Sequence, residues 1–321
     1  MKINSKTKIE LYYQTLRIRL IEEAIAKEYS KQEMRCPIHL SVGQESVAVA
    51  VCSNLKKNDL VVSSHRAHAH YISKGGSIKK MIAELYLKNT GCSKGRTGSM
   101  HLNDRSVGFV ASIPIVASNI PIAVGLAKSI KMKKENKIVV VFFGEAATEE
   151  GVFFESINFA QLFQLPIMFI CENNGYSVYS SKDLRFPKSR DNCKIVSGFG
   201  LKSIKLDGSQ LEKNYKIISE ASNMARKNKP VYIELETYRF LEHCGPNNDD
   251  KLNYRSKNEI LNWKKKDPIN VYKNTLLKKN IIKNDLIDIF EKKIKKEINS
   301  AFKFAKISNY PIYDKKRFMD L

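Results

Sequence analysis

Hydrophobic residues recur along this chain in two patterns, a spacing of three to four residues and short unbroken apolar runs. The first pattern predicts amphipathic helices, and the second is typical of strands buried on both faces of a sheet. We expect helices over residues 7–31, 44–55, 78–87, 120–134, 149–163 and 211–227, and one from an Asn284 cap to Phe302. We expect strands over residues 60–63, 137–143, 165–171, 203–206 and 231–237.

The central part of the chain, residues 137–171, decides the fold class. KIVVVFF and LPIMFIC flank a helical stretch, and this order of elements forms a βαβ unit with parallel strands. The wider alternation predicts an α/β protein with a mostly parallel central sheet flanked by helices, with N- and C-terminal helical extensions. Ligands of such sheets bind at the carboxyl ends of the strands.

Two regions depart from this alternation. Residues 91–108 are punctuated by glycines and predict a long ordered loop, which is usually functional inside a compact domain. Residues 264–321 hold 16 Lys and Arg against 7 Asp and Glu. We therefore expect one α/β domain over residues 1–262 and a basic helical extension of the same domain over residues 263–321.

The net charge of +22, from 55 basic and 33 acidic residues, raises the alternative of a nucleic-acid-binding protein. Of the basic residues 43 are Lys and 12 are Arg, although Arg is favoured for bidentate contacts with phosphates and guanines. The pattern of basic and aromatic residues typical of RNA-recognition motifs is also missing. The composition favours a lysine-rich solvated surface, and we expect no nucleic-acid partner.

We recognise no membrane span, no signal peptide and no C-x-x-C pair in the sequence. No run reaches the roughly 18 apolar residues of a membrane span, and the first residues lack the apolar segment of a signal peptide. The six cysteines are scattered, without a C-x-x-C pair, and predict reduced thiols. We expect a cytoplasmic location and no membrane association.

Candidate ligands for a metal follow two neighbouring strands. Glu145, with Gly144 and Ala146 beside it, ends the first, and Asn173, Asn174 and Tyr176 end the next. Carboxylate and amide oxygens suit Mg²⁺, which is usually shared with a substrate phosphate. In the alternative interpretation, Glu145 caps the following helix and the asparagines only form a turn.

Cationic groups follow two other strands. His65, Arg66 and His68 stand in SHRAHAH, and an Arg in such a loop is best explained as an anion ligand. A zinc cluster is the alternative, but alternating histidines after a strand point to opposite sides. His243 follows the last strand at the same expected edge, where it is either functional or a structural hydrogen-bonding group. The sequence thus predicts a diphosphate site without GxxxxGK[ST] or GxGxxG.

The residues from 144 to 176, GEAATEEGVFFESINFAQLFQLPIMFICENNGY, closely resemble the thiamine diphosphate motif, in which GDG precedes an NN pair. The surrounding sequence is similar to the alpha subunits of two-component 2-oxo acid dehydrogenases of the pyruvate, branched-chain and acetoin types. The likeness runs from about residue 10 to about residue 270. Its other segments are HLSVGQE, SSHRAHAHYISKGG, GCSKGRTGSMH, IPIAVG, LDG, ETYRFLEH and NYRSKNEILNWKKKDPI.

This resemblance implies the thiamine diphosphate-binding fold, with thiamine diphosphate and Mg²⁺ as cofactors. By position in the motifs, it implies that Glu145, the side chain of Asn174 and the main chain of Tyr176 bind Mg²⁺. It also implies that His65 and Arg66 bind the diphosphate and that Val116 lies near the pyrimidine. His68 would belong to the active site, and His243 would lie beside both the diphosphate and the reacting carbon.

The chain departs from the family pattern at four positions. Glu145 replaces the usual Asp, Ala146 replaces the second glycine, Pro114 replaces a glycine before the IV pair, and Cys244 replaces a Ser that is regulatory in eukaryotic relatives. Mg²⁺ demands near-ideal geometry, so the longer side chain of Glu145 bears directly on the metal. The departures concern metal geometry and substrate type more than cofactor binding.

The resemblance also implies partners. The glutamate that activates the cofactor lies on a beta subunit in this family, so we expect an alpha-two beta-two heterotetramer and transfer of the acyl group to a lipoyl acyltransferase. The expected reaction is oxidative decarboxylation of a 2-oxo acid, or acetoin cleavage. A non-oxidative lyase or synthase acting on a 2-oxo acid or a sugar-derived substrate is the alternative. Glu45 is interpreted as a helix-start residue or structural contact, because the helix dipole favours acidic first-turn residues.

Overall fold

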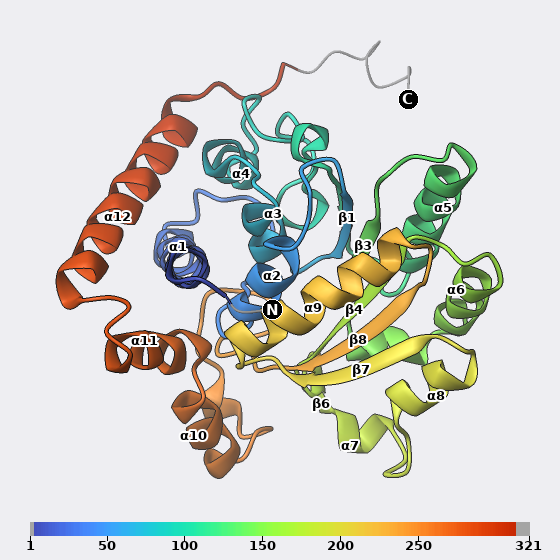
Figure 1. Ribbon diagram of the computed structural model, residues 1–321. Helices are drawn as coiled ribbons and strands as arrows, with labels where there is room; N and C mark the ends of the chain where they lie inside the picture. The colour runs from blue at the N-terminus through green and yellow to red at the C-terminus, as the bar shows by residue number, and fades with distance from the viewer. Residues whose placement is uncertain (1–2, 313–321) are drawn as a thin grey trace.

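A six-stranded sheet forms the centre of the computed structural model, which describes residues 3–312 (Figure 1). All five strand pairings in this sheet are parallel, in the order β2-β1-β3-β4-β8-β7. The strands are β1 (Leu60–Ser64), β2 (Phe109–Ile113), β3 (Val139–Gly144), β4 (Ile167–Asn173), β7 (Lys202–Asp207) and β8 (Val231–Glu236). A separate hairpin pairs β5 (Tyr176–Ser177) with β6 (Ser180–Ser181). The predicted α/β fold with a parallel sheet is confirmed.

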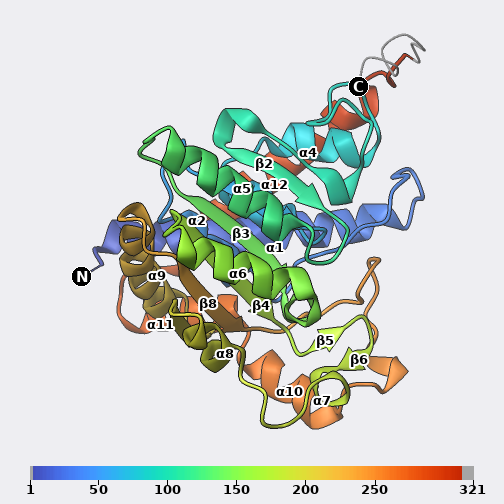
Figure 2. The same ribbon diagram turned by 90° about the vertical axis from the view of Figure 1, so that its right-hand side faces the viewer.

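Helices cover both faces of the sheet, as the unbroken apolar strands require. In β3, Val139, Val141 and Phe143 pack into the core on one face, whereas Val140 and Phe142 pack into the core on the other. The first face is covered by α5 (Asn119–Met132), α6 (Gly151–Leu162) and α8 (Asn192–Gly198) (Figure 2). The second face is covered by α2 (Glu45–Cys52), α3 (His68–Ser73) and α9 (Leu211–Arg226).

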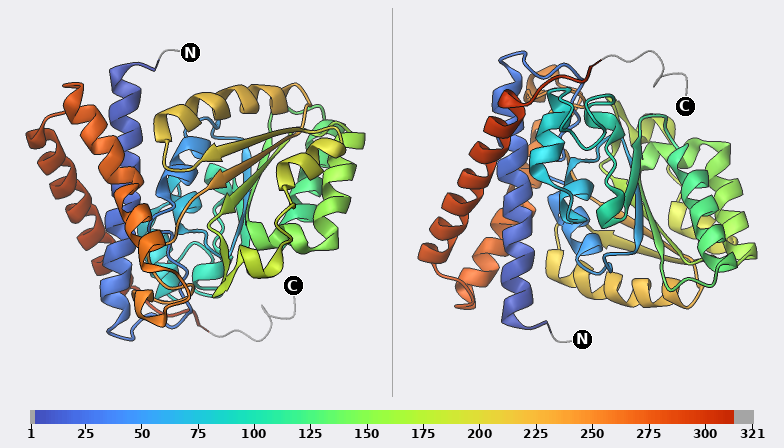
Figure 3. Two further views of the ribbon diagram at one scale, coloured as in Figure 1. Left: turned by 90° about the horizontal axis from the view of Figure 1, so that it is seen from below. Right: turned by 90° about the horizontal axis from the view of Figure 1, so that it is seen from above.

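A further set of helices lies outside this second face (Figure 3). It comprises α1 (Ser5–Tyr29), α4 (Ile78–Leu85), α11 (Pro268–Lys278) and α12 (Asn284–Ile307). Ile294, Ala301 and Ala305 bury one side of α12 in the core, and Arg17 of α1 holds Glu297 through two hydrogen bonds of 2.9 and 2.8 Å. Across residues 3–312, none of the helices combines the length and apolar character needed to cross a membrane.

Three local expectations were wrong. Residues 68–73 form the helix α3 rather than an extended segment, so His68 and His70 lie on a helix that three residues separate from β1. Strand β2 was not predicted, because its residues FVASI are short and only partly apolar. Asn284 does not cap α12: Lys283 occupies the cap position without a side-chain hydrogen bond. The short helices α7 (Lys182–Arg185), α8 and α10 (Lys257–Lys265) were not anticipated either.

The glycine-rich loop is ordered around one buried carboxylate. Glu84 of α4 accepts hydrogen bonds from the backbone N–H groups of Ser93, Gly95, Thr97 and Gly98, at 2.9 to 3.1 Å. Gly95 and Gly98 adopt positive φ, and a Cβ on Gly98 would lie 2.6 Å from Cys36 Cβ. The loop leads into the 3₁₀ turn Ser99–His101, and so Glu84 fixes the entry to that turn.

The strand order reverses between β1 and β3. From β1 the chain moves outward to β2 and then returns to place β3 on the other side of β1. In open α/β sheets such a switch point leaves a crevice outside the carboxyl ends of the strands. The segments after β1, β3, β4 and β8 therefore meet at this edge, and these segments carry most of the predicted site residues.

Candidate cofactor site

A cavity of about 270 Å³ lies at the switch point. Of the predicted site residues, Asn173 and His68 do not line it, and the others do, namely His65, Arg66, Val116, Gly144, Glu145, Ala146, Asn174, Tyr176 and His243. These residues come from the ends of five strands, β1, β2, β3, β4 and β8, and they line one cavity, as expected for the carboxyl edge of a parallel sheet. The cavity also contacts His39, Gln44 and Glu172, to which the sequence had assigned no role at this site.

The carboxylate side of the cavity is built by the turn after β3. Glu145 opens the 3₁₀ segment Glu145–Glu149 and is 1% exposed. Its Oε1 accepts a hydrogen bond from Arg185 Nη2 at 2.5 Å. Burial raises the pKa of Glu145, and Arg185 opposes that shift by favouring the carboxylate. An oxygen donor is therefore held at the cavity wall beside a cation.

The amide side of the cavity is built by the turn after β4. Gly175, at φ +80°, lets the chain reverse so that Asn174 Oδ1 accepts from the backbone N–H of Tyr176 at 3.1 Å. Asn174 Nδ2 donates to Gln44 Oε1 at 3.1 Å, which fixes the orientation of the amide. Tyr176 is anchored separately, because its hydroxyl donates to Glu259 at 2.7 Å.

Arg66 supplies the buried cation. Its guanidinium donates to the carbonyl of Leu40 at 2.6 Å and to the carbonyl of His243 at 3.1 Å. Burial lowers the pKa of Arg66 to about 10, with Arg239 adding to the shift. Arg66 therefore stays protonated at neutral pH, and a guanidinium in this position suits a phosphate oxygen.

Three imidazoles gather next to Arg66. The ring centroids of His39 and His65 lie 4.6 Å apart, those of His39 and His243 5.1 Å, and those of His65 and His243 5.5 Å. Burial first and Arg66 second lower their pKa values, to about 2 for His39, about 4 for His65 and about 3 for His243. All three rings are therefore neutral near pH 7. His39 belongs to the HLSVGQE segment, which was the only sequence signal for it.

The lowered pKa values of His39, His65 and His243 predict that the folded protein becomes less stable in mild acid. In the unfolded chain each ring titrates at about 6.5, so below that pH the unfolded state binds protons that the folded state excludes. Stability is therefore full above about pH 6.5 and falls as the pH drops towards the folded-state values. His39→Gln should flatten this dependence, by on the order of 2 kcal/mol at pH 5. Urea unfolding of both proteins from pH 7.5 to 5 measures it, and parallel curves would contradict the prediction.

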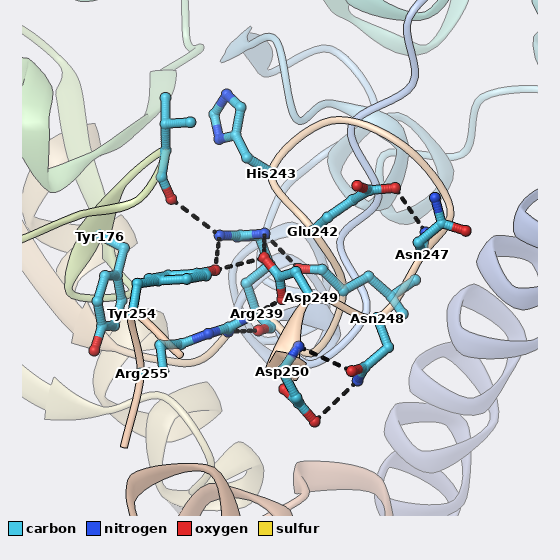
Figure 4. Close-up of polar contacts among 12 residues, drawn as sticks. Tyr176, Arg239, Glu242, His243, Asn247, Asn248, Asp249, Asp250, Tyr254 and Arg255 are labelled. Carbon is cyan, nitrogen blue, oxygen red and sulfur yellow. Dashed lines mark hydrogen bonds and ion pairs between the residues drawn. The ribbon is translucent and has the colours of Figure 1, made fainter. Parts of the chain in front are cut away.

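The loop that carries His243 is braced by a polar network (Figure 4). Arg239 donates to the carbonyl of Val178 at 3.2 Å and to the hydroxyl of Tyr254 at 3.0 Å, and Tyr254 in turn donates to Asp249 at 2.5 Å. Arg255 pairs with Asp249 and donates to the carbonyl of Arg239 at 2.6 Å. The network joins the loop to the β5–β6 hairpin, which also carries Tyr176.

His68 is placed elsewhere. It is fully buried, with Nδ1 2.7 Å from Glu22 Oε1 and Nε2 2.8 Å from Ser99 Oγ. This arrangement links α1, α3 and the glycine-rich loop. The structure does not bring His68 into the cavity wall, so its active-site role stays a prediction. Glu45, in contrast, starts α2 and pairs with Arg19 at 2.5 Å, as the structural interpretation expected.

The residues present fit a diphosphate with a hard divalent cation. Oxygen donors of Glu145 and Asn174 line one part of the cavity, while Arg66 and neutral imidazoles line another. His39 Nδ1 is buried and has no hydrogen-bond partner within residues 3–312, as expected for a group that faces a ligand. The oxygen atoms of Glu145 and Asn174 suit a metal ion, whereas Arg66 and the imidazoles suit the oxygens of a diphosphate.

Fold and cavity together define an α/β protein whose ligand site lies at the switch point of a parallel sheet. Comparison with known proteins refines this class. The model of the dehydrogenase E1 component family matches residues 13–313. The chain therefore belongs to the dehydrogenase E1 component family.

Curated relatives match over nearly the whole chain. The pyruvate dehydrogenase E1 component subunit alpha of Rickettsia felis is 36% identical over 305 residues, covering 94% of this chain and 92% of the relative. The alpha subunit of acetoin:2,6-dichlorophenolindophenol oxidoreductase of Bacillus subtilis is 32% identical, covering 97% and 92% respectively. A chloroplastic pyruvate dehydrogenase E1 alpha subunit of Arabidopsis thaliana is 33% identical, covering 96% and 73%. The predicted family is confirmed.

Proposed function

We propose that this chain is the alpha subunit of a thiamine diphosphate- and Mg²⁺-dependent dehydrogenase. The reaction would be oxidative decarboxylation of a 2-oxo acid, or cleavage of acetoin, with acyl transfer to a lipoyl carrier. The observation that carries this proposal is the cavity in which Glu145 and Asn174 lie with Arg66 and His243. Family membership implies use of thiamine diphosphate, and the donor set supports the divalent cation.

Each wall of the cavity has a distinct task in this proposal. Glu145, Asn174 Oδ1 and the carbonyl of Tyr176 would hold the metal, while Arg66 and His65 would bind diphosphate oxygens. The backbone at Val116 would lie against the pyrimidine. When bound, the cofactor supplies the nucleophilic carbon and the electron sink for decarboxylation. His243 is neutral near pH 7, so it can accept or donate a hydrogen bond at the reacting carbonyl.

A beta subunit is part of the proposal. Ile115, Val116 and Val178 line the cavity and are exposed by 68%, 50% and 41%. Apolar side chains at the mouth of a polar site are typical of a surface that another chain covers. The relatives are named as alpha subunits, which implies a second subunit in those proteins. A beta subunit that brings the activating glutamate would complete the site in an alpha-two beta-two assembly.

The two alternatives have less support. The relatives are named as dehydrogenase components or as an oxidoreductase, which favours the oxidative reaction over a non-oxidative lyase or synthase. The matched family is a dehydrogenase component rather than a nucleic-acid-binding protein, and the lysine excess is spread along the chain, with α12 holding six Lys against four Asp and Glu. The oxidative proposal therefore stands as the conclusion.

Cofactor titration of the complex with its beta-type partner tests the proposal. Thiamine diphosphate should bind with an affinity that rises with Mg²⁺, and Glu145→Ala should abolish that dependence on Mg²⁺. The reason is that the variant removes the one carboxylate among the expected metal ligands. Isothermal titration calorimetry measures both affinities. If the wild-type complex failed to bind, or Glu145→Ala responded to Mg²⁺ like the wild type, the proposal would be wrong.

A further inference from the structure

The segment after the β5–β6 hairpin folds back over the turn that carries Glu145. Arg185, the last residue of α7, forms ion pairs with Glu145 and with Glu149 at the two ends of that turn. Five residues later, Arg190 donates to the carbonyl of Thr148 in the same turn. We call Arg185, Phe186 and Arg190 the arginine clamp.

The clamp is packed rather than loosely placed. Phe186 is 5% exposed and lies near both guanidiniums, with the Cζ atoms of Arg190 and Arg185 4.2 and 5.4 Å from its ring centroid. The side chain of Arg185 is 13% exposed. A guanidinium close to an aromatic ring and paired with two carboxylates has little rotational freedom. Arg185 therefore provides a fixed reference point for the Glu145 carboxylate.

The contact with Glu145 leaves room for a second ligand. Arg185 Nη2 engages one carboxylate oxygen, Oε1, at 2.5 Å, and Glu145 also lines the cavity. With Arg190 included, the two carboxylates of the turn face two guanidiniums and their formal charges cancel. A cation at the other carboxylate oxygen of Glu145 would therefore not meet an excess of positive charge.

The length of the Glu145 side chain makes such an anchor necessary. Glutamate has one more rotatable bond than aspartate, so an unanchored Glu145 would sample several positions. Mg²⁺ requires near-ideal octahedral geometry, whereas Ca²⁺ accepts irregular coordination. Groups that orient metal ligands from behind often contribute tenfold to hundredfold in affinity.

From these observations we propose that Arg185 is a positioning residue for the metal site. It holds Glu145 Oε1 so that the remaining carboxylate oxygen is presented to Mg²⁺, and it thereby favours Mg²⁺ over Ca²⁺. This inference rests on the proposed function, because it takes Glu145 as a metal ligand. It adds a residue that lies outside the thiamine diphosphate motif and 40 positions from Glu145.

The experiment measures Mg²⁺ and Ca²⁺ affinities of the thiamine diphosphate-loaded complex by isothermal titration calorimetry, for the wild type and three variants. Arg185→Gln should weaken Mg²⁺ binding about tenfold to hundredfold, with a smaller loss for Ca²⁺. Arg185→Lys should recover part of the loss because it retains the charge. Lys188→Gln changes an exposed residue of the same segment and should match the wild type.

Each possible result of this experiment either supports or overturns the positioning role of Arg185. Unchanged Mg²⁺ affinity in Arg185→Gln would overturn the inference, and so would tighter binding, because Arg185 would then compete with the metal. Equal losses for Mg²⁺ and Ca²⁺ without recovery in Arg185→Lys would overturn it in favour of a purely structural role. If Arg185→Gln does not fold by circular dichroism, the Mg²⁺/Ca²⁺ ratio of Arg185→Lys decides alone. A wild-type complex that binds neither cofactor nor metal would instead refute the proposed function.

Discussion

Replacing Arg66 by methionine is expected to weaken thiamine diphosphate binding to the assembled complex by a hundredfold or more, on the order of 3 kcal/mol. Arg66 is the buried cation of the cavity, and its guanidinium also holds the carbonyls of Leu40 and His243. Methionine keeps much of the volume but removes every donor. The variant therefore loses the phosphate contact and the anchor of the His243 loop together. Fluorescence or calorimetric titration of the complex at saturating Mg²⁺ measures the change.

Two further variants make this result interpretable. Arg66→Lys keeps the positive charge but not the planar guanidinium with its paired donors. Its affinity for thiamine diphosphate should therefore lie between those of Arg66→Met and the wild type. Arg105→Met removes an exposed arginine of the glycine-rich region and should bind the cofactor as the wild type does. Wild-type affinity in Arg66→Met would show that this guanidinium does not bind the diphosphate, and the proposed role of Arg66 would be wrong.

The largest expected effect on stability belongs to Asp59. This side chain is fully buried at the start of β1 and accepts from the backbone N–H groups of Lys56 and Ile138, at 2.6 and 3.1 Å. It also forms two hydrogen bonds with Arg226 of α9, at 2.9 and 2.5 Å. One carboxylate thus ties β1 to the residue before β3 and to a helix of the covering layer.

Asp59→Asn should lower the free energy of unfolding by about 3–5 kcal/mol, because it leaves the Arg226 guanidinium without its charge partner and places an amide N–H₂ against donors. Urea unfolding monitored by circular dichroism measures the loss. Glu28→Gln is the matched control, since its partners Lys31 and Lys306 are 52% and 39% exposed and such surface pairs contribute about 1 kcal/mol or less each. A loss below about 1 kcal/mol in Asp59→Asn would mean that the buried pair contributes no more than a surface one.

The sequence predicted the centre of the fold well because its strands are buried on both faces. KIVVVFF and LPIMFIC admit few other conformations once a helix of suitable length separates them. Strand β2 escaped prediction because Phe109 and Ser112 are its only buried residues, so its sequence lacks an apolar run. The helix α3 escaped prediction because histidines carry little propensity information and tertiary contacts decide their conformation.

Part of the site could likewise be predicted from the sequence, and part of it could not. Glu145, Asn174 and Arg66 follow directly from strands, so sequence order alone placed them at one edge. Arg185 reaches Glu145 from 40 positions away, within an ordinary polar stretch, and only the folded chain reveals the contact. His39 lies in a loop before α2, where no local pattern points to the cavity.

The short connection between β1 and α3 has a consequence for the kinetics of ligand capture. Only three residues, 65–67, separate the strand from the helix, and the neighbouring carbonyls of Leu40 and His243 already hold Arg66. Contacts within the chain therefore hold this part of the wall in place. Binding there costs little conformational entropy, so we infer that arrival at this wall is limited by encounter and desolvation rather than by a rearrangement of the chain.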